Sequence, residues 1–478
     1  MTNRGGEGFF AGIDPVAAIL YLVIVLIGCV SITSASFDEN TTNVFDFSHF
    51  YIKQLIWVGV ALLSAIVVLL MDVSFFHRYA YILYGVGISL LLATLVFGRE
   101  VNGAKAWFEF GSIRLQPVEL AKISTGLAVA RVMSDYSFSI NKFGDFMKVA
   151  IVLAIPLGII ILQNDTGSGI VFGSFLFVFY REGLNKWLCI PVLVVAALFI
   201  LSFVLSPILL LIASILVCTA VDAAMSGGWI LRLRYLAALS LLSLVIYLVG
   251  AVVSEDGISF YSAVLSSSIL SMFFVVVYAL RHKIMSTILV AAFFIFEMMF
   301  LPTTNYIFNS ILRDHQRNRI LTFLGMVSDP LGTGYNVNQS KIAIGSGGLF
   351  GKGFLHGTQI KYGFVPERHT DFIFCGLAEE WGFVGAFTLL GCICALILRL
   401  MRMGERQPET FGRVYCYCVA SILLFHTLVN VGMTIGLMPV MGIPLPLVSY
   451  GGSSLMAFTV LISIAIRLDA ASNRSLSF

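Results

Sequence analysis

Charged side chains and glycines are concentrated in two polar stretches of an otherwise apolar chain. The charged groups there could act as catalytic or ligand-binding residues, and the glycines could shape the backbone around a ligand. The longer stretch, residues 305–370, contains Arg317, Arg319 and a glycine-rich run that ends at Lys352 and Gly353. Cations stabilise a departing anionic group, and a carboxylate activates an attacking hydroxyl as a general base. The glycine-rich run alone is weak evidence for a phosphate-binding loop, because such loops connect a strand to a helix.

The shorter stretch, residues 98–116, contains Arg114 and leads into an apolar segment that carries Glu119 and Lys122. A spacing of three residues places both side chains on one face of a helix. Charged groups inside a membrane span are costly and usually functional. Glu119 and Lys122 are therefore either a self-neutralising pair or part of a polar site that opens outward.

Other polar positions have two interpretations each. Asp165 is either a turn or cap residue of the next helix or an acid that lines a cavity. Asp329, which precedes a proline, either begins a turn or takes part in the reaction. The small residues from Ser449 to Ser454 either allow close helix packing or contact a ligand. Thr370 is expected to cap the helix that follows it.

The composition indicates the kind of chain that must position these residues. Of 478 residues, 59% are hydrophobic and 12% are charged, whereas soluble domains are about 45–50% apolar and about 25% charged. These figures exclude a soluble enzyme, a disordered chain and a fibrous protein. The net charge of +3 gives no support for a nucleic-acid partner. Apolar runs of about 20 residues, the length of a spanning helix, recur along the chain, so we predict an all-α polytopic membrane protein.

About fourteen segments are expected to span the membrane as helices. They cover residues 15–35, 51–71, 75–97, 117–134, 146–162, 167–180, 186–205, 207–226, 229–252, 258–281, 284–304, 371–399, 411–436 and 444–468. The segment 167–180 is short for a span. Pro207 separates two of the segments, because proline clashes with a continuing helix. A large loop, residues 305–370, precedes the last three helices.

The distribution of lysine and arginine sets the predicted orientation. With a cytoplasmic N-terminus, the cytoplasmic loops collect basic residues such as Arg181, Arg232 and Arg402, and most opposing loops are acidic or uncharged. Basic residues favour the cytoplasmic side. We therefore expect both termini inside. The two polar stretches are exceptions, because they place several cations outside.

Ordered motifs along the chain resemble those of the SEDS family, the shape, elongation, division and sporulation proteins. The matching segments are residues 102–107, 116–122, 316–319, a longest one that runs from 328–335 through 366–373, and 444–453. They extend from the first helices to the C-terminal region, so the resemblance is specific. Residues 354–359 and 366–369 are similar to the elongation members of the family rather than to the division members.

The resemblance implies a peptidoglycan glycosyltransferase that polymerises lipid II into glycan strands during cell elongation and cell-shape maintenance. It implies Asp329 as the catalytic carboxylate, which would deprotonate the acceptor hydroxyl. The implied candidates for binding the sugar or the lipid pyrophosphate are Arg114, Glu119, Lys122, Asp165, Arg317, Arg319, Lys352, Arg368, His369 and Ser449. A divalent cation, Mg²⁺ or Mn²⁺, could share the pyrophosphate, and no other cofactor is expected.

The resemblance also implies a partner and a location. The partner is a class B penicillin-binding protein, the transpeptidase that crosslinks the strands. The location is the bacterial inner membrane, with the active site on the extracytoplasmic face. Two alternatives remain open, a flippase for the same lipid and a non-catalytic scaffold. A flippase would carry charges through the bilayer depth and a repeat of broken helices, and a scaffold would need no carboxylate at position 329.

The chain departs from the family pattern at a few positions. Ala106 replaces a usual arginine, Val118 replaces a serine, and Asn164 and Thr166 flank Asp165 where proline and leucine are usual. The family typically has ten helices, so about four more are expected as an insert. We predict that the insert forms a peripheral bundle with its polar groups at the helix ends and no ligand for the reaction. The predicted domains are residues 1–205, 206–304, 305–370 and 371–478.

Overall fold

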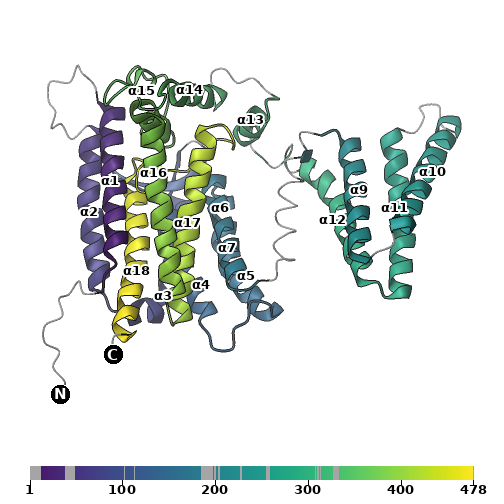
Figure 1. Cartoon of the computed structure of the whole chain (residues 1–478), viewed down its shortest axis with the longest axis horizontal. Helices are drawn as coiled ribbons and strands as arrows, with labels where there is room; N and C mark the ends of the chain where they lie inside the picture. The colour runs from purple at the N-terminus through teal and green to yellow at the C-terminus, as the bar shows by residue number, and fades with distance from the viewer. Residues whose placement is uncertain are drawn as a thin grey trace. The chain divides into compact units, whose positions relative to one another are not determined.

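The fold is that of a computed structural model of the whole chain (Figure 1). The structure describes residues 12–37, 49–101, 103–111, 113–184, 198, 201–202, 205–226, 229–253, 259–306, 308, 310, 312, 314–326 and 333–476. The predicted catalytic residue Asp329 lies outside these residues. The chain divides into two compact units: unit 1 comprises Met1–Cys189 with Ser328–Phe478, and unit 2 comprises Ile190–Val327. The predicted insert, residues 206–304, falls within unit 2.

Unit 1 is a helical bundle whose most buried helices come from the end of the chain. Its helices are α1 (Pro15–Ser36), α2 (Phe50–Leu70), α3 (Val73–Phe97), α4 (Pro117–Met133), α5 (Phe143–Leu162), α6 (Thr166–Val171), η1 (Phe172–Ser174), α7 (Phe175–Arg181), α14 (Thr333–Ser346), α15 (Thr358–Lys361), α16 (Ile373–Glu405), α17 (Thr410–Thr434) and α18 (Gly452–Leu476). The apolar stretches of α17 and α18 are each 78% buried, against 17% for α2 and 22% for α3 and α5. The outer helices therefore present broad apolar faces of the kind that contact lipid.

The described helices support a multi-pass membrane protein. Ten of them are long and apolar enough to cross a membrane. The predicted span 167–180 is interrupted, because the 3₁₀ turn η1 separates α6 from α7. Helix α4 has 17 residues, and most of the predicted span 186–205 lies outside the described residues. The total of fourteen spans stays a prediction.

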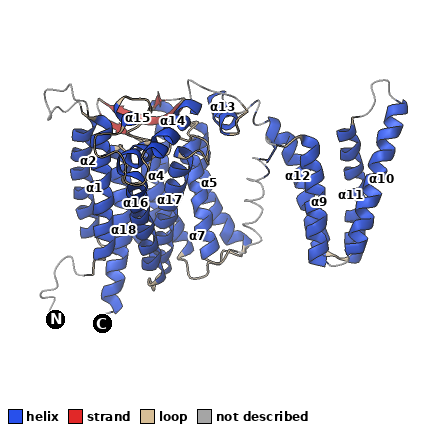
Figure 2. Ribbon diagram, turned by 45° about the horizontal axis from the view of Figure 1, so that its top comes forward, coloured by secondary structure: helices blue, strands red, loops and turns tan. Residues whose placement is uncertain are grey.

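The polar stretch 98–116 forms a small sheet, which is an exception to the all-α prediction. Strands β1 (Arg99–Val101), β2 (Ala104–Phe110) and β3 (Ile113–Leu115) pair antiparallel in that order and are drawn in red in Figure 2. Gly103 and Gly111 make the two turns with φ of 84° and 64°, a conformation that favours glycine. Strands this short give little alternation of hydrophobicity, so the sequence pattern does not reveal them.

The long polar stretch 305–370 also contains regular structure. Helix α13 (Asp314–Phe323) belongs to unit 2, whereas α14 and α15 belong to unit 1. Most of α14 is polar or glycine, as its sequence Thr-Gly-Tyr-Asn-Val-Asn-Gln-Ser shows. A search for apolar runs therefore reads this segment as a loop.

A cluster of ion pairs gathers three helix ends at one end of unit 1. Arg406, which follows α16, donates to Asp14 at 2.9 Å and to Asp469 at 2.6 Å. Arg399 donates to Asp14 at 2.8 Å. Asp14 is also the N-cap of α1, and Asp469 lies near the end of α18. The first and last helices thus begin and end on the same side of the unit, as expected for termini on one side of a membrane.

The backbone of the glycine-rich run packs directly against the backbone of α16. Gly382 has φ of 67° and interrupts the helix. Around this break, Lys352 N–H and Gly353 N–H donate to the carbonyls of Glu379 and Glu380 at 3.1 and 2.9 Å, and Phe383 N–H donates to Gly348 at 2.9 Å. A side chain cannot fit between these two backbone segments, because a Cβ on Gly382 would lie 2.3 Å from Gly351 N. The glycines therefore serve backbone packing here.

We expect Gly382→Ala to destabilise unit 1. A Cβ in a left-handed conformation costs roughly 1–2 kcal/mol, and the overlap with Gly351 adds about 1–3 kcal/mol. Thermal unfolding of the purified protein in detergent measures the loss. Gly391→Ala is the matched control on the same helix, because open space surrounds a Cβ built there; it should leave the unfolding temperature equal or higher. Equal unfolding temperatures for the two variants would contradict the packing role of Gly382.

Unit 2 contains α9 (Pro207–Ser226), α10 (Trp229–Val253), α11 (Phe260–His282), α12 (Met285–Tyr306) and α13. Leu211, Ile215, Leu239, Val264 and Phe294 form its small apolar core. Glu297 of α12 is 1% exposed and is hydrogen-bonded to Ser214 of α9. The expectation that polar groups lie at the ends of these helices is therefore wrong at Glu297.

Candidate active site

Two charged side chains at the start of α4 are removed from solvent. Glu119 and Lys122 are 2% and 1% exposed, and the Lys122 ammonium lies 2.8 Å from both carboxylate oxygens. A buried charge is tolerated when a partner and hydrogen bonds compensate its lost hydration. The predicted placement of the two residues on one helix face is confirmed, and the side chains form an ion pair, which is one of the two interpretations; their part in a substrate site stays a prediction.

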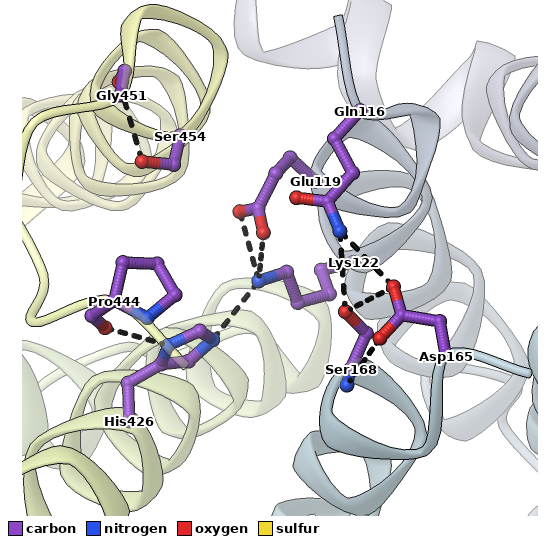
Figure 3. A network of polar contacts seen from close by, with 9 residues as sticks. All are labelled: Gln116, Glu119, Lys122, Asp165, Ser168, His426, Pro444, Gly451 and Ser454. Carbon is purple, nitrogen blue, oxygen red and sulfur yellow. Dashed lines mark hydrogen bonds and ion pairs between the residues drawn. The ribbon is translucent and has the colours of Figure 1, made fainter. Parts of the chain in front are cut away.

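His426 of α17 extends this pair across the bundle (Figure 3). Its Nε2 lies 2.9 Å from Lys122 Nζ. Because an ammonium group can only donate, Nε2 must accept and the ring proton must reside on Nδ1. Nδ1 lies 3.2 Å from the Pro444 carbonyl oxygen, to which it donates. The Phe458 ring of α18 lies 5.2 Å from Lys122 Nζ and meets His426 edge-on. One ammonium group thus joins α4, α17, α18 and the segment before α18.

A second polar group lies on the other side of the α4 N-terminus (Figure 3). Asp165 is the N-cap of α6 and accepts from Ser168 N–H at 3.1 Å. Its other oxygen accepts from the Gln116 amide at 3.0 Å and from the Ser168 hydroxyl at 2.8 Å. The cap role of Asp165 is therefore confirmed, and its role in binding substrate stays a prediction.

The segment before α16 is bound to the segment that precedes α18. Ser449 is 3% exposed, donates to the Thr370 carbonyl at 2.6 Å and accepts from Leu445 N–H at 2.8 Å. Asn430 of α17 donates to the carbonyls of Asp371 and Ile443 at 2.9 and 2.7 Å. Two family-like motifs, residues 366–373 and 444–453, are therefore adjacent in space. A backbone held this tightly is suited to presenting neighbouring side chains in fixed positions.

The predicted cap at Thr370 is wrong. Helix α16 begins at Ile373 with Phe372 as a cap residue that makes no side-chain hydrogen bond. The Thr370 hydroxyl instead donates to the Glu367 carboxylate at 2.9 Å. The helix starts two residues later than a cap at Thr370 requires, because the preceding backbone forms turns in which Thr370 N–H and Phe372 N–H donate to the Glu367 carbonyl at 3.1 and 3.2 Å.

His369 is an aromatic contact residue at this position. Its ring stacks on Phe50 with centroids 4.3 Å apart and meets Tyr450 edge-on at 5.9 Å. Burial, together with the neighbouring Arg368 charge, lowers the pKa of His369. The imidazole is thus held in the neutral form at pH 7, in which it is able to accept a proton or a hydrogen bond.

The predicted cations Arg368 and Lys352 have partners in unit 1. Arg368 Nε donates to the Ala35 carbonyl at 2.8 Å and its Nη1 donates to Ile360 at 2.7 Å. Lys352 Nζ lies 2.7 Å from the buried Glu379 carboxylate, which also accepts from Thr358 at 3.0 Å. Both cations therefore stabilise the segment around α15. Their binding of a pyrophosphate stays a prediction.

The remaining predicted cations lie on two elements, β3 and α13. Arg114 of β3 is 62% exposed and donates to Glu109 at 2.7 Å. Arg317 and Arg319 lie on α13 of unit 2, and their binding of substrate stays a prediction. In the described part of the chain, no group of three or more His, Cys, Asp or Glu side chains is placed to hold a metal ion.

Sequence reasoning missed His426 and Asn430. They are four residues apart on α17 and therefore lie on one helix face. Both are polar residues inside an apolar run of 25 residues. The rule that polar residues within spans are functional by default would have identified them. Their contacts, with Lys122 and with the segments on either side of the site, required the structure.

The chain belongs to the FtsW/RodA/SpoVE family, described as cell cycle proteins, whose model matches residues 15–221 and 230–474. Curated relatives match over nearly their full length. The peptidoglycan glycosyltransferase RodA of Treponema pallidum is 32% identical over 98% of this chain and 99% of its own. The peptidoglycan glycosyltransferase MrdB of Escherichia coli K12 is 31% identical over 95% of this chain and 93% of its own. A relative named FtsW, from Buchnera aphidicola, is 27% identical over 94% of this chain. The predicted resemblance to the elongation members is confirmed.

Solved structures share the fold. A chain described under "Structural coordination of polymerization and crosslinking by a peptidoglycan synthase complex" is 28% identical, with a TM-score of 0.59 over 96% of this chain and 98% of that chain. RodA of Thermus thermophilus is 24% identical, with a TM-score of 0.55 over 96% of this chain and 97% of its own. The polytopic helical fold is therefore that of known members of the family.

We expect Lys122→Met to destabilise the protein strongly. The substitution leaves the Glu119 carboxylate buried without its ammonium partner, which costs about 3–5 kcal/mol. The double variant Glu119→Met with Lys122→Met removes both charges and should recover most of the lost thermal stability. His426 loses the same donor in both variants, so that effect cancels in the comparison. A double variant as unstable as Lys122→Met would refute the role of charge pairing.

Proposed function

We propose that this chain polymerises lipid II into glycan strands, as a peptidoglycan glycosyltransferase of the elongation type. The observation that carries the proposal is the match to the family and to its curated relatives along the length of the chain. Those relatives are named peptidoglycan glycosyltransferases. The packing of motifs 366–373 and 444–453 against each other supports it, because a shared site requires that they meet.

The proposed reaction joins two lipid-linked saccharides. A sugar hydroxyl of the acceptor attacks the anomeric carbon of the donor, a new glycosidic bond forms, and the lipid pyrophosphate leaves with the electron pair of the broken bond. Asp329 removes the hydroxyl proton as a general base. Cations offset the negative charge that develops on the pyrophosphate. Exposed Arg114 is free to move towards a substrate, since its pair with Glu109 lies at the surface.

The described residues of unit 1 act as positioning groups in this proposal. The Lys122 ammonium and His426 fix the segment that contains Pro444. Ser449 and Asn430 then hold the segment that ends at Asp371. These contacts place His369 and Tyr450 side by side as an aromatic wall. Such a wall is suited to the apolar face of a sugar ring.

The proposal places the site on the extracytoplasmic face of the bacterial inner membrane. The sheet, α14 and α15 lie at the same end of unit 1 (Figure 2), opposite the Asp14–Arg406 cluster. A cytoplasmic N-terminus, as the positive-inside rule predicts, puts that end outside. We also propose a class B penicillin-binding protein as the partner, which agrees with the related chain from a polymerisation and crosslinking complex.

We expect Asp329→Asn to fold and insert normally but to make no glycan. Loss of a general base costs about 10²–10⁴-fold in rate. The assay follows fluorescent lipid II on gels, with the purified chain alone and with its transpeptidase. Asp135→Asn is the control, because Asp135 makes an exposed pair with Arg131 and should polymerise normally. Polymerisation by Asp329→Asn at the control rate would exclude Asp329 as the general base and favour a different catalytic carboxylate. If the unmodified chain also makes no glycan, the result would favour a flippase or a scaffold.

The charge swap Glu119→Lys with Lys122→Glu tests the site against a purely neutralising pair. We expect the swapped protein to insert and fold but to lose polymerisation. A carboxylate at position 122 cannot donate a hydrogen bond to His426 Nε2, and this disturbs the hydrogen bond between His426 Nδ1 and the Pro444 carbonyl. Lys122→Glu alone should impair activity more than insertion. Full activity of the swapped protein would return the pair to a structural role.

A further inference from the structure

Unit 2 contains an apolar cavity at one end of its four long helices. Its volume is about 510 Å³, within the range of roughly 300–1,000 Å³ that is typical of small-molecule sites. It is lined by the C-terminal halves of α9 and α11 and by the N-terminal halves of α10 and α12. The apolar walls include Leu239, Leu242, Phe274, Val275 and Phe294.

A hydrogen-bonded group of polar side chains closes one part of the cavity. Asp222 of α9 accepts from Arg232 Nε of α10 at 2.8 Å and from the Thr287 hydroxyl of α12 at 2.7 Å. All three side chains line the cavity. Because the Asp222 charge is matched by Arg232, this group contributes little net charge.

Arg234 adds a second positive charge to the same cavity. It lies one turn into α10 from Trp229, lines the cavity and is exposed. Among the described residues it makes no hydrogen bond or ion pair. Arg281 and Lys283 add further exposed positive charge at this end of the helices, where α11 leads into α12.

We propose that this cavity binds a membrane glycerophospholipid with an anionic headgroup, whose phosphate contacts Arg234 and whose acyl chain occupies the apolar walls. Basic pockets between spanning helices recognise anionic headgroups in this way. The predicted topology puts this end of α9–α12 on the cytoplasmic side, where the anionic lipid would come from the inner leaflet. The cavity lining shares no residue with the proposed glycosyl transfer, and the lipid proposal does not depend on that activity.

The test measures lipid binding to the full-length protein in a mild detergent by native mass spectrometry. Dioleoylphosphatidylglycerol and dioleoylphosphatidylcholine are titrated in parallel, because they share acyl chains and differ in net charge. The unmodified protein should bind phosphatidylglycerol more tightly. Arg234→Gln should weaken that binding about fivefold, the effect of one basic residue at a lipid headgroup, and should leave phosphatidylcholine unchanged. Ala238→Trp, which fills the cavity from its exposed wall, should weaken both lipids.

Two controls separate the cavity from general attraction. Arg281→Gln removes the same charge at the same end of unit 2 but outside the cavity lining, and it should leave binding unchanged. Glycerol 3-phosphate should fail to displace the lipid, because it lacks the acyl chains. Equal binding of the two lipids, an equal effect of Arg281→Gln and Arg234→Gln, or displacement by glycerol 3-phosphate would each overturn the proposal.

Discussion

The ammonium group of Lys122 is almost completely buried, and its contacts link helices of unit 1 that are far apart in the sequence. One carboxylate, from Glu119, neutralises the charge, and one imidazole, from His426, accepts the remaining hydrogen bond. The imidazole must then donate from its other nitrogen, which fixes the carbonyl of Pro444. The segment before α18 is thus linked, through His426, to a side chain of α4.

The sequence predicts the membrane spans and the local side-chain pairs of unit 1, but it does not predict the contacts between distant segments. Hydropathy predicts the spans of α1, α2 and α3 closely, because each is a long apolar run. Helical spacing predicts the Glu119–Lys122 pair, since both residues lie on one helix. Long-range partners such as Lys122 and His426 are 304 residues apart, and no periodic pattern links them. The sheet and α14 were missed for a different reason, because they are short or polar and depend on tertiary contacts for their stability.

The glycine-rich run shows why residue type alone can mislead. Glycines next to a lysine suggest a cradle for a phosphate, yet Gly351 approaches the backbone of α16 and Lys352 pairs with Glu379. Absence of a side chain serves two purposes in proteins, close approach to a ligand and close approach to another backbone. Surrounding geometry decides between them. Here the four backbone hydrogen bonds between residues 348–353 and 379–384 identify the second purpose.

The break at Gly382 divides α16 into two helical parts, Ile373 to Trp381 and Phe383 to Glu405. Main-chain hydrogen bonds join the glycine-rich segment to residues on both sides of the break, to Glu379 and Glu380 before it and to Phe383 and Val384 after it. A displacement of the glycine-rich segment would therefore act on both parts of α16 at once, directly at the break. The attachment point of the loop thus lies within the range given for α16, about nine residues after Ile373, where Gly382 leaves the helical conformation, and not at the helix end.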